Sequence, residues 1–66
     1  MEDNITQDRV TNVRAYRLLP GDSIVIHSRA YEIKEVVEYK TSSLKFIFIN
    51  GSELHCHCRS LQQKLQ

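Results

Sequence analysis

The sequence predicts a small all-β domain, a closed or half-closed barrel of five short strands. Phe46–Ile49 is the most apolar run of the 66-residue chain and contains only aromatic and β-branched residues. Asn50-Gly51 follows directly, a pair typical of tight hairpin turns because both residues accept a positive φ. Apolar and polar side chains then alternate over residues 54–59, which is the period of a strand. These observations predict a hairpin over residues 44–59 that forms one wall of the barrel.

The N-terminal part of the chain divides into an arm and the start of the barrel. Residues 1–11 are polar, with only two apolar side chains after the initial Met, and predict a flexible arm. The barrel domain is then expected over residues 12–66. Val13–Leu19 predicts the first strand. A short helix over residues 6–17 is the alternative, because apolar residues there also recur at helical spacing.

The second and third strands are separated from the first by a strong turn signal. Leu19–Asp22 predicts a type II turn, since its proline presets φ and its glycine supplies the positive φ at the next position. Ser23–His27 then predicts a compact strand, and Tyr31–Lys40 a long one. Two adjacent apolar residues, Val36 and Val37, interrupt the alternation of the long strand. They predict a bulge or bend where this strand passes from one sheet to another.

The C-terminal residues predict a short helical turn. Ser60–Gln63 fits a capping box, in which the serine side chain and the glutamine side chain satisfy free N–H groups at a helix start. Leu61 and Leu65 are four residues apart and would share a helix face. Only one or two turns are expected, which are marginal in isolation.

Three segments, Leu19–Ile26, Ala30–Ile33 and Phe46–Gly51, together resemble small SH3-like barrels. KOW-type ribosome-associated domains and the N-terminal domain of translation elongation factor P have this pattern, which covers Leu18 to Arg59 here. The resemblance implies an SH3-like fold that contacts nucleic acid or a nucleoprotein. The elongation factor's lysine-bearing loop is not recognisable, so its particular function is not implied. Sm-like barrels share the pattern but would place a helix first.

Composition and charge restrict the class of protein. The net charge is +1 and the pI about 7.8, well below the value of about 9 that is typical of strong nucleic-acid binders. A local basic patch remains compatible with this balance. No apolar run approaches the roughly 18 residues of a membrane span. The polar, acidic start of the chain is unlike a signal peptide, which predicts a cytoplasmic protein without disulfides.

His55-Cys56-His57-Cys58 places four metal-capable side chains in a row. On a strand the two histidines share one face and the two cysteines share the other, so one ion cannot bind all four. We therefore predict no metal site. His55 and His57 are the candidates for a metal pair, which would need a third ligand such as His27 or Glu53. The interpretation we prefer is that the cysteines lie in the core and the histidines on a half-exposed face.

The sequence predicts neither catalysis nor a cofactor. The serines near histidines are Ser28 and Ser52, and neither lies in a nucleophile elbow or beside an evident Asp partner. The chain has two glycines, too few for a glycine-rich phosphate loop. A 66-residue chain also rarely encloses a pocket of the roughly 300 Å³ that small-molecule sites use.

The register of the hairpin decides which face is core. A two-residue Asn50-Gly51 turn places Phe46 and Phe48 on an outer face with the histidines, whereas a three-residue loop inverts both faces. In the first register Leu44 joins the two phenylalanines in an exposed apolar patch. Such patches mark partner surfaces. Either register leaves one apolar set incompletely covered in so small a barrel, so a homodimer or a protein partner is predicted.

The interpretation we adopt is a non-catalytic binding module that contacts nucleic acid or a nucleoprotein through a strand face. Aromatic side chains would stack on bases and basic side chains would contact phosphates. The predicted contact residues are Arg14, Tyr16, Arg17, Arg29, Tyr31, Lys34, Lys45, Phe46 and Phe48. Interleaved glutamates on the long strand dilute the positive field. The alternative is a protein-interaction module or small inhibitor that uses the apolar strand face or a sheet edge.

Overall fold

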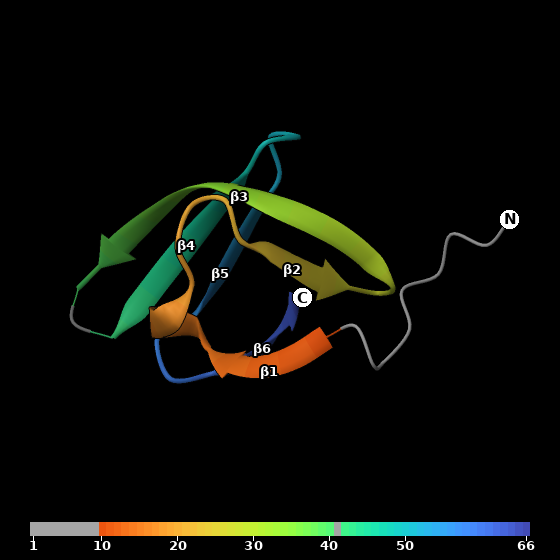
Figure 1. Cartoon of the computed structure of the whole chain (residues 1–66). Helices are drawn as coiled ribbons and strands as arrows, with labels where there is room; N and C mark the ends of the chain where they lie inside the picture. Colours follow the sequence, from red (N-terminus) through yellow and green to blue (C-terminus); the bar gives the residue numbers. More distant parts are fainter. Residues whose placement is uncertain (1–9, 41) are drawn as a thin grey trace, which may run out of the picture.

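The computed structural model describes residues 10–40 and 42–66, which form one antiparallel sheet of six strands. The elements are β1 (Val10–Arg14), the 3-10 turn η2 (Ala15–Arg17), β2 (Ser23–Ile26), β3 (Arg29–Tyr39), β4 (Ser43–Phe48), β5 (Glu53–His57) and β6 (Leu61–Leu65). The strand order is β1-β6-β2-β3-β4-β5 (Figure 1). The predicted all-β class is confirmed, with six strands in place of five. The sheet is not closed, because β1 and β5 end the order without pairing with each other.

The long strand β3 joins the two halves of the sheet and curves across the molecule (Figure 1). Its first residues pair with β2 and its later residues with β4. Ile33 pairs with Phe48 and Val36 with Phe46, so three steps along β3 match two along β4. The extra residue, Lys34, makes a bulge that turns both Ile33 and Val36 towards the core. The predicted bend is therefore confirmed, but it lies just before Val36 and not at the Val36-Val37 pair.

The predicted hairpin of β4 and β5 is confirmed, and its loop has three residues, Ile49–Gly51. The Phe48 N–H donates to the Ser52 carbonyl and the Gly51 N–H donates to the Phe48 carbonyl, both at 2.9 Å. Gly51 has φ +93°, a conformation that glycine adopts without a steric cost. The Asn50 side-chain oxygen accepts the Ser52 N–H at 2.9 Å and fixes the loop. The loop is thus the three-residue alternative, which sets the register.

This register buries the phenylalanines. Phe46 pairs with Leu54, and Phe46 and Phe48 are only 0% and 2% exposed. The apolar outer face of Leu44, Phe46 and Phe48 expected from the two-residue turn is therefore wrong. The core consists of Ala15, Leu18, Ile24, Ile33, Leu44, Phe46 and Phe48. An exposed phenylalanine patch is no longer an argument for a dimer.

The N-terminal prediction needs two corrections. Strand β1 begins at Val10, inside the range expected for the arm, and residues 1–9 of that arm lie outside the described residues. The strand also ends at Arg14 and not at Leu19, because Ala15 begins the 3-10 turn. The helix considered as an alternative over residues 6–17 is, within the described part, only this three-residue turn. The type II turn after it is confirmed: Gly21 has φ +98° and the Asp22 N–H donates to the Leu19 carbonyl at 3.0 Å.

The C-terminal residues form strand β6 and not the predicted helical turn. β6 lies between β1 and β2, with Arg14 opposite Leu61 and Val10 opposite Leu65. The Ser60 hydroxyl donates to the His57 carbonyl at 2.8 Å and does not cap a helix. A short isolated helix is marginal in water, whereas a strand here gains neighbours on both sides. Among the described residues, no helix has the length and apolar character needed to cross a membrane.

Candidate nucleic-acid interface

The structure gathers three of the nine predicted contact residues and separates the others. Arg14, Tyr16 and Arg17 lie together at the end of β1 and in η2. The remaining six are distributed over β3 and β4: Arg29 and Tyr31 at the start of β3, Lys34 at the bulge, Lys45 on the outer face of β4, and Phe46 and Phe48 in the core. Tyr31 is half-buried, with its ring centroid 5.3 Å from that of Phe48. The predicted residues therefore do not form one continuous strand face.

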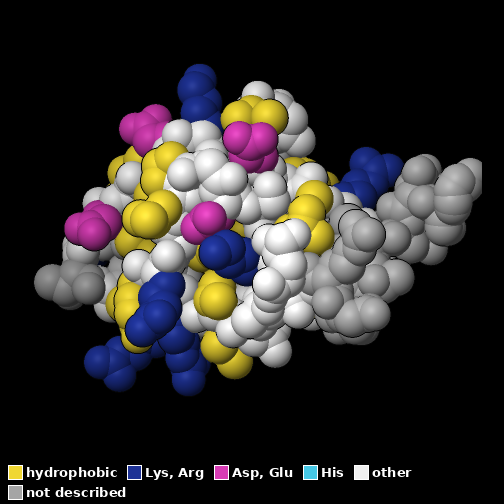
Figure 2. Space-filling view, viewed as in Figure 1, with side chains coloured by type: hydrophobic (Ala, Val, Ile, Leu, Met, Phe, Trp, Pro, Cys, Tyr) yellow, Lys and Arg dark blue, Asp and Glu magenta, His cyan; other side chains and the backbone are white. Residues whose placement is uncertain are grey.

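Arg59 lies beside Arg14 and Tyr16, and Arg17 follows Tyr16 in η2. We call Arg14, Tyr16, Arg17 and Arg59 the arginine cluster. Arg14 Nη1 donates to the Arg59 carbonyl at 2.9 Å. Arg14, Tyr16, Cys58 and Arg59 line an open hollow of about 480 Å³, and none of these four is acidic. Tyr16 is 57% exposed. Lys and Arg side chains gather at the lower left of Figure 2, where Figure 1 places η2.

Backbone hydrogen bonds hold the arginine cluster in place. The Ala15 N–H donates to the Ser60 carbonyl at 2.8 Å and the Tyr16 N–H donates to the Cys58 carbonyl at 2.9 Å. Ala15 is fully buried and anchors the turn to the core. The flanking side chains, Arg14 and Tyr16, are therefore presented to solvent. Within the described ranges, no carboxylate forms an ion pair with any arginine of the cluster.

Arg59 is not among the contact residues predicted from the sequence, because no motif in the neighbouring residues marks it as part of a site. It lies in the turn between β5 and β6, and it is 45 residues from Arg14 in sequence. Only the pairing of η2 with this turn brings the two side chains together.

A neighbouring hollow is lined by Glu38, Lys40, Ser43, Leu44 and Cys58. It contains one charge of each sign, so it does not enlarge the positive surface of the arginine cluster.

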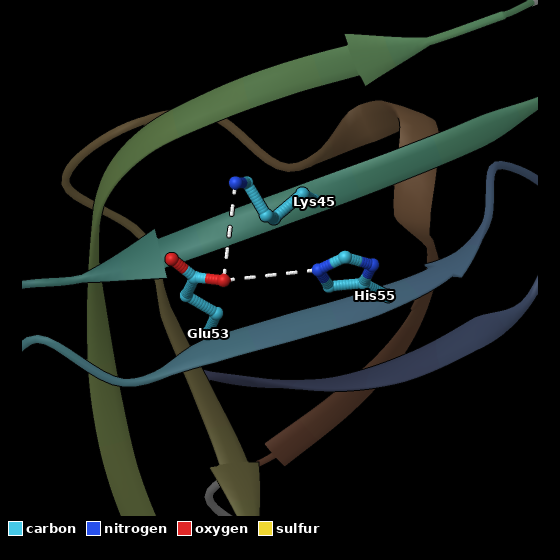
Figure 3. Close-up of polar contacts among 3 residues, drawn as sticks. All are labelled: Lys45, Glu53 and His55. Atoms are coloured by element: carbon cyan, nitrogen blue, oxygen red, sulfur yellow. Dashed lines mark ion pairs between the residues drawn. The ribbon is translucent and has the colours of Figure 1, made fainter.

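A second polar cluster lies on the outer face of β4 and β5. Figure 3 shows the Glu53 carboxylate between Lys45 and His55. Glu53 Oε1 is 3.8 Å from Lys45 Nζ and 3.7 Å from His55 Nε2. The register explains the arrangement, since Lys45 faces His55 directly across the two strands. Because Glu53 neutralises Lys45, this face is a poor phosphate site.

The histidines and cysteines are separated as strand geometry predicts. Cys56 and Cys58 are free, half-buried thiols that pack against the core. His55 and His57 lie on the outer face, and His57 Nδ1 accepts the Arg59 N–H at 3.0 Å. In the part of the chain that the structure describes, no three potential ligands come together for a metal ion.

The pKa of Lys45 reports on this outer cluster. The neighbouring Tyr39 side chain raises the pKa above its ordinary value of 10.5, desolvation opposes the rise, and Glu53 adds to it. Lys45 Nζ lies 5.4 Å from the centroid of the Tyr39 ring. Because the pKa of Lys45 is raised in the folded state, its charged ammonium group contributes to the stability of the fold. This contribution is fully present below pH 10.5 and is lost as the pH rises through the folded-state pKa.

We expect Tyr39→Phe to lower the pKa of Lys45 towards its ordinary value, because the substitution removes the hydroxyl and keeps the ring beside His55. Titration of the lysine side chain by NMR measures the change. Tyr31→Phe removes a hydroxyl from another part of the sheet and serves as the control. An unchanged Lys45 titration in Tyr39→Phe would contradict the assigned cause.

Comparisons with protein-family models, with curated proteins and with solved structures gave no match. The resemblance to SH3-like barrels therefore stays a prediction.

Proposed function

We propose that the chain is a non-catalytic binding module that holds a single-stranded nucleic acid at the arginine cluster. The observation that supports this most directly is the hollow lined by Arg14, Tyr16, Cys58 and Arg59, which places guanidinium groups around an exposed aromatic ring without an acidic residue. Guanidinium groups match phosphate oxygens in a bidentate geometry. An exposed tyrosine provides a face on which a base can stack. The contact surface is thus the end of the sheet and not a strand face.

The charge distribution supports the same location. Residues 10–66 carry eight of the nine basic side chains but only five of the eight acidic ones, a net charge of +3. Three of those five acids, Glu32, Glu35 and Glu38, lie on β3. Asp22 pairs with Lys64 at 3.7 Å, and Glu53 pairs with Lys45. The positive field is therefore concentrated at the arginine cluster.

Titration of the full chain with labelled single-stranded RNA and DNA oligonucleotides tests the proposal. Three phosphate contacts predict a salt slope of about −2 for a single strand. The variant Arg17→Ala/Arg59→Ala should remove most of the slope, whereas Arg29→Ala/Lys34→Ala removes the same net charge elsewhere and should retain most of it. Tyr16→Ala should weaken binding roughly tenfold through lost stacking. Absence of binding at low salt, or equal losses in the two double variants, would refute the proposal.

The second candidate is a protein-interaction module, and one specific observation favours it. Among the described residues, β1 pairs only with β6 and β5 pairs only with β4, so the sheet has two open edges. An open edge can accept a further strand by β-augmentation.

A further inference from the structure

We propose that the open edge of β5 is self-complementary and pairs with β5 of a second copy of this chain. The two strands would run antiparallel, with a two-fold axis at His55. The proposal is independent of nucleic-acid binding, because the arginine cluster and the outer β5 edge use different groups.

Hydrogen bonds to the β4 side just before and just after β5 show which backbone groups of β5 reach the open edge. The Phe48 N–H donates to the Ser52 carbonyl and the Cys58 N–H donates to the Ser42 carbonyl, at 2.9 and 2.8 Å. Residues 52 and 58 therefore face β4, and so do the even-numbered residues between them. Glu53 and His55 direct both their N–H and C=O groups to the other side. His57 directs only its N–H there as a free group, because its carbonyl already accepts the Ser60 N–H at 3.1 Å and the Ser60 hydroxyl at 2.8 Å. Among the described residues no strand pairs with that side.

The register centred on His55 places a hydrogen-bond donor opposite a carboxylate twice. Glu53 of each copy comes to lie opposite His57 of the other, on the same outer face. His57 Nδ1 already accepts the Arg59 N–H, so the neutral imidazole carries its proton on Nε2. That N–H is available to donate to the facing carboxylate. Glu53 also contacts Lys45 and His55, and its two oxygens leave acceptor capacity for this further donor.

The opposite face of the same register is also compatible with pairing. Leu54 of each copy comes to lie opposite Cys56 of the other, and both side chains are half-buried against the core. The pairing would thus extend the apolar face of each sheet across the two-fold axis. A small domain with a limited core gains particularly from such association.

The other open edge lacks this complementarity. The Ala15 N–H donates to Ser60, so the residues of β1 that direct their backbone groups outward are Val10, Asn12 and Arg14. Antiparallel pairing of β1 with itself would centre on Asn12 and place Val10 opposite Arg14. No pairing of a hydrogen-bond donor with a carboxylate results. The side-chain pattern therefore selects β5, and a closed dimer in preference to an open polymer.

Sedimentation velocity of the full chain, without nucleic acid and with EDTA present, tests the pairing from micromolar to millimolar concentration. The expected result is a reversible equilibrium between monomer and dimer only. His57→Glu places two carboxylates opposite each other twice and should raise the dimer dissociation constant about tenfold or more. Glu53→Lys/His57→Glu places a lysine opposite each new carboxylate and should recover the dimer. His27→Glu makes the same charge change in an exposed turn and should leave association unchanged.

A second variant tests the pairing without introducing a charged side chain, which could itself affect folding. His55→Pro removes the outward N–H at the centre of the pairing while leaving the ladder with β4 intact, and it should abolish the dimer. Circular dichroism confirms that each variant is folded. A native chain that stays monomeric, a series of larger polymers, or a double charge variant that fails to recover the dimer would overturn the proposal.

Discussion

Phe46→Ala should leave the domain largely unfolded at room temperature. Phe46 is fully buried on the central strand of the β3-β4-β5 half, and it is the largest fully buried side chain. Truncating a buried phenylalanine costs about 3–5 kcal/mol. A domain of this size has a total stability of about 3–5 kcal/mol from its core. Urea and thermal denaturation followed by far-UV circular dichroism measure the loss.

The same experiment distinguishes the two hairpin registers. In a two-residue turn Phe46 would lie on the outer face, and its truncation would change stability little. Ile49→Ala is the matched control, because Ile49 lies in the neighbouring loop and is 63% exposed. We expect that control to shift stability by no more than about 0.5 kcal/mol. A Phe46→Ala protein with native stability would contradict the three-residue loop.

Local patterns in the sequence predicted the elements that depend on neighbouring residues. The hairpin follows from Asn50-Gly51, the earlier turn from Pro20-Gly21, and the bend from a disturbed alternation in β3. Each is set by φ preferences or by side-chain period within a few residues. Local preferences did not determine the register of the β4-β5 hairpin, because Asn50-Gly51 is compatible with both a two-residue and a three-residue loop. The choice between them depends on packing Phe46 against residues far along the chain.

In the candidate site, too, some features follow from neighbouring residues in the sequence and others depend on tertiary pairing. Arg14, Tyr16 and Arg17 were identified from residue type, and they do lie together because they are adjacent in sequence. Arg59 joins them only through the pairing of η2 with the turn before β6. Lys45 has the right residue type but is neutralised by Glu53 from the neighbouring strand. Tertiary pairing, which residue type does not reveal, therefore decides which basic residues are available to a ligand.

The C-terminal segment shows how tertiary pairing overrides a local signal. Ser60–Gln63 carries a helix-start pattern, but the capping bonds of an isolated turn contribute little without a packed face. In β6 the same backbone pairs with β1 along its whole length and reaches Lys64 opposite Ile24 of β2. A strand between two neighbours satisfies more backbone groups than a frayed helical turn.

Gln62→Pro is therefore expected to destabilise the protein strongly. The Ala15 N–H donates to Ser60, so the alternation of the ladder directs the Gln62 N–H to Val13 of β1. Proline removes this donor and leaves the Val13 carbonyl without a partner, at a cost of about 1–3 kcal/mol. The proline ring adds a steric cost inside a central strand. Thermal denaturation should show a clearly lowered midpoint or no cooperative transition.

Asn12→Pro provides the comparison, because Asn12 is an exposed residue of the edge strand β1 whose N–H points away from β6. Proline is tolerated at such edge positions, so the midpoint should change much less than for Gln62→Pro. If residues 60–65 were a loosely attached helical turn, Gln62 would lie in a segment that contributes little to the fold. Gln62→Pro would then lower the midpoint less than Asn12→Pro. Comparing the thermal midpoints of these two variants therefore tests whether residues 61–65 form a strand that lies between β1 and β2 in the sheet.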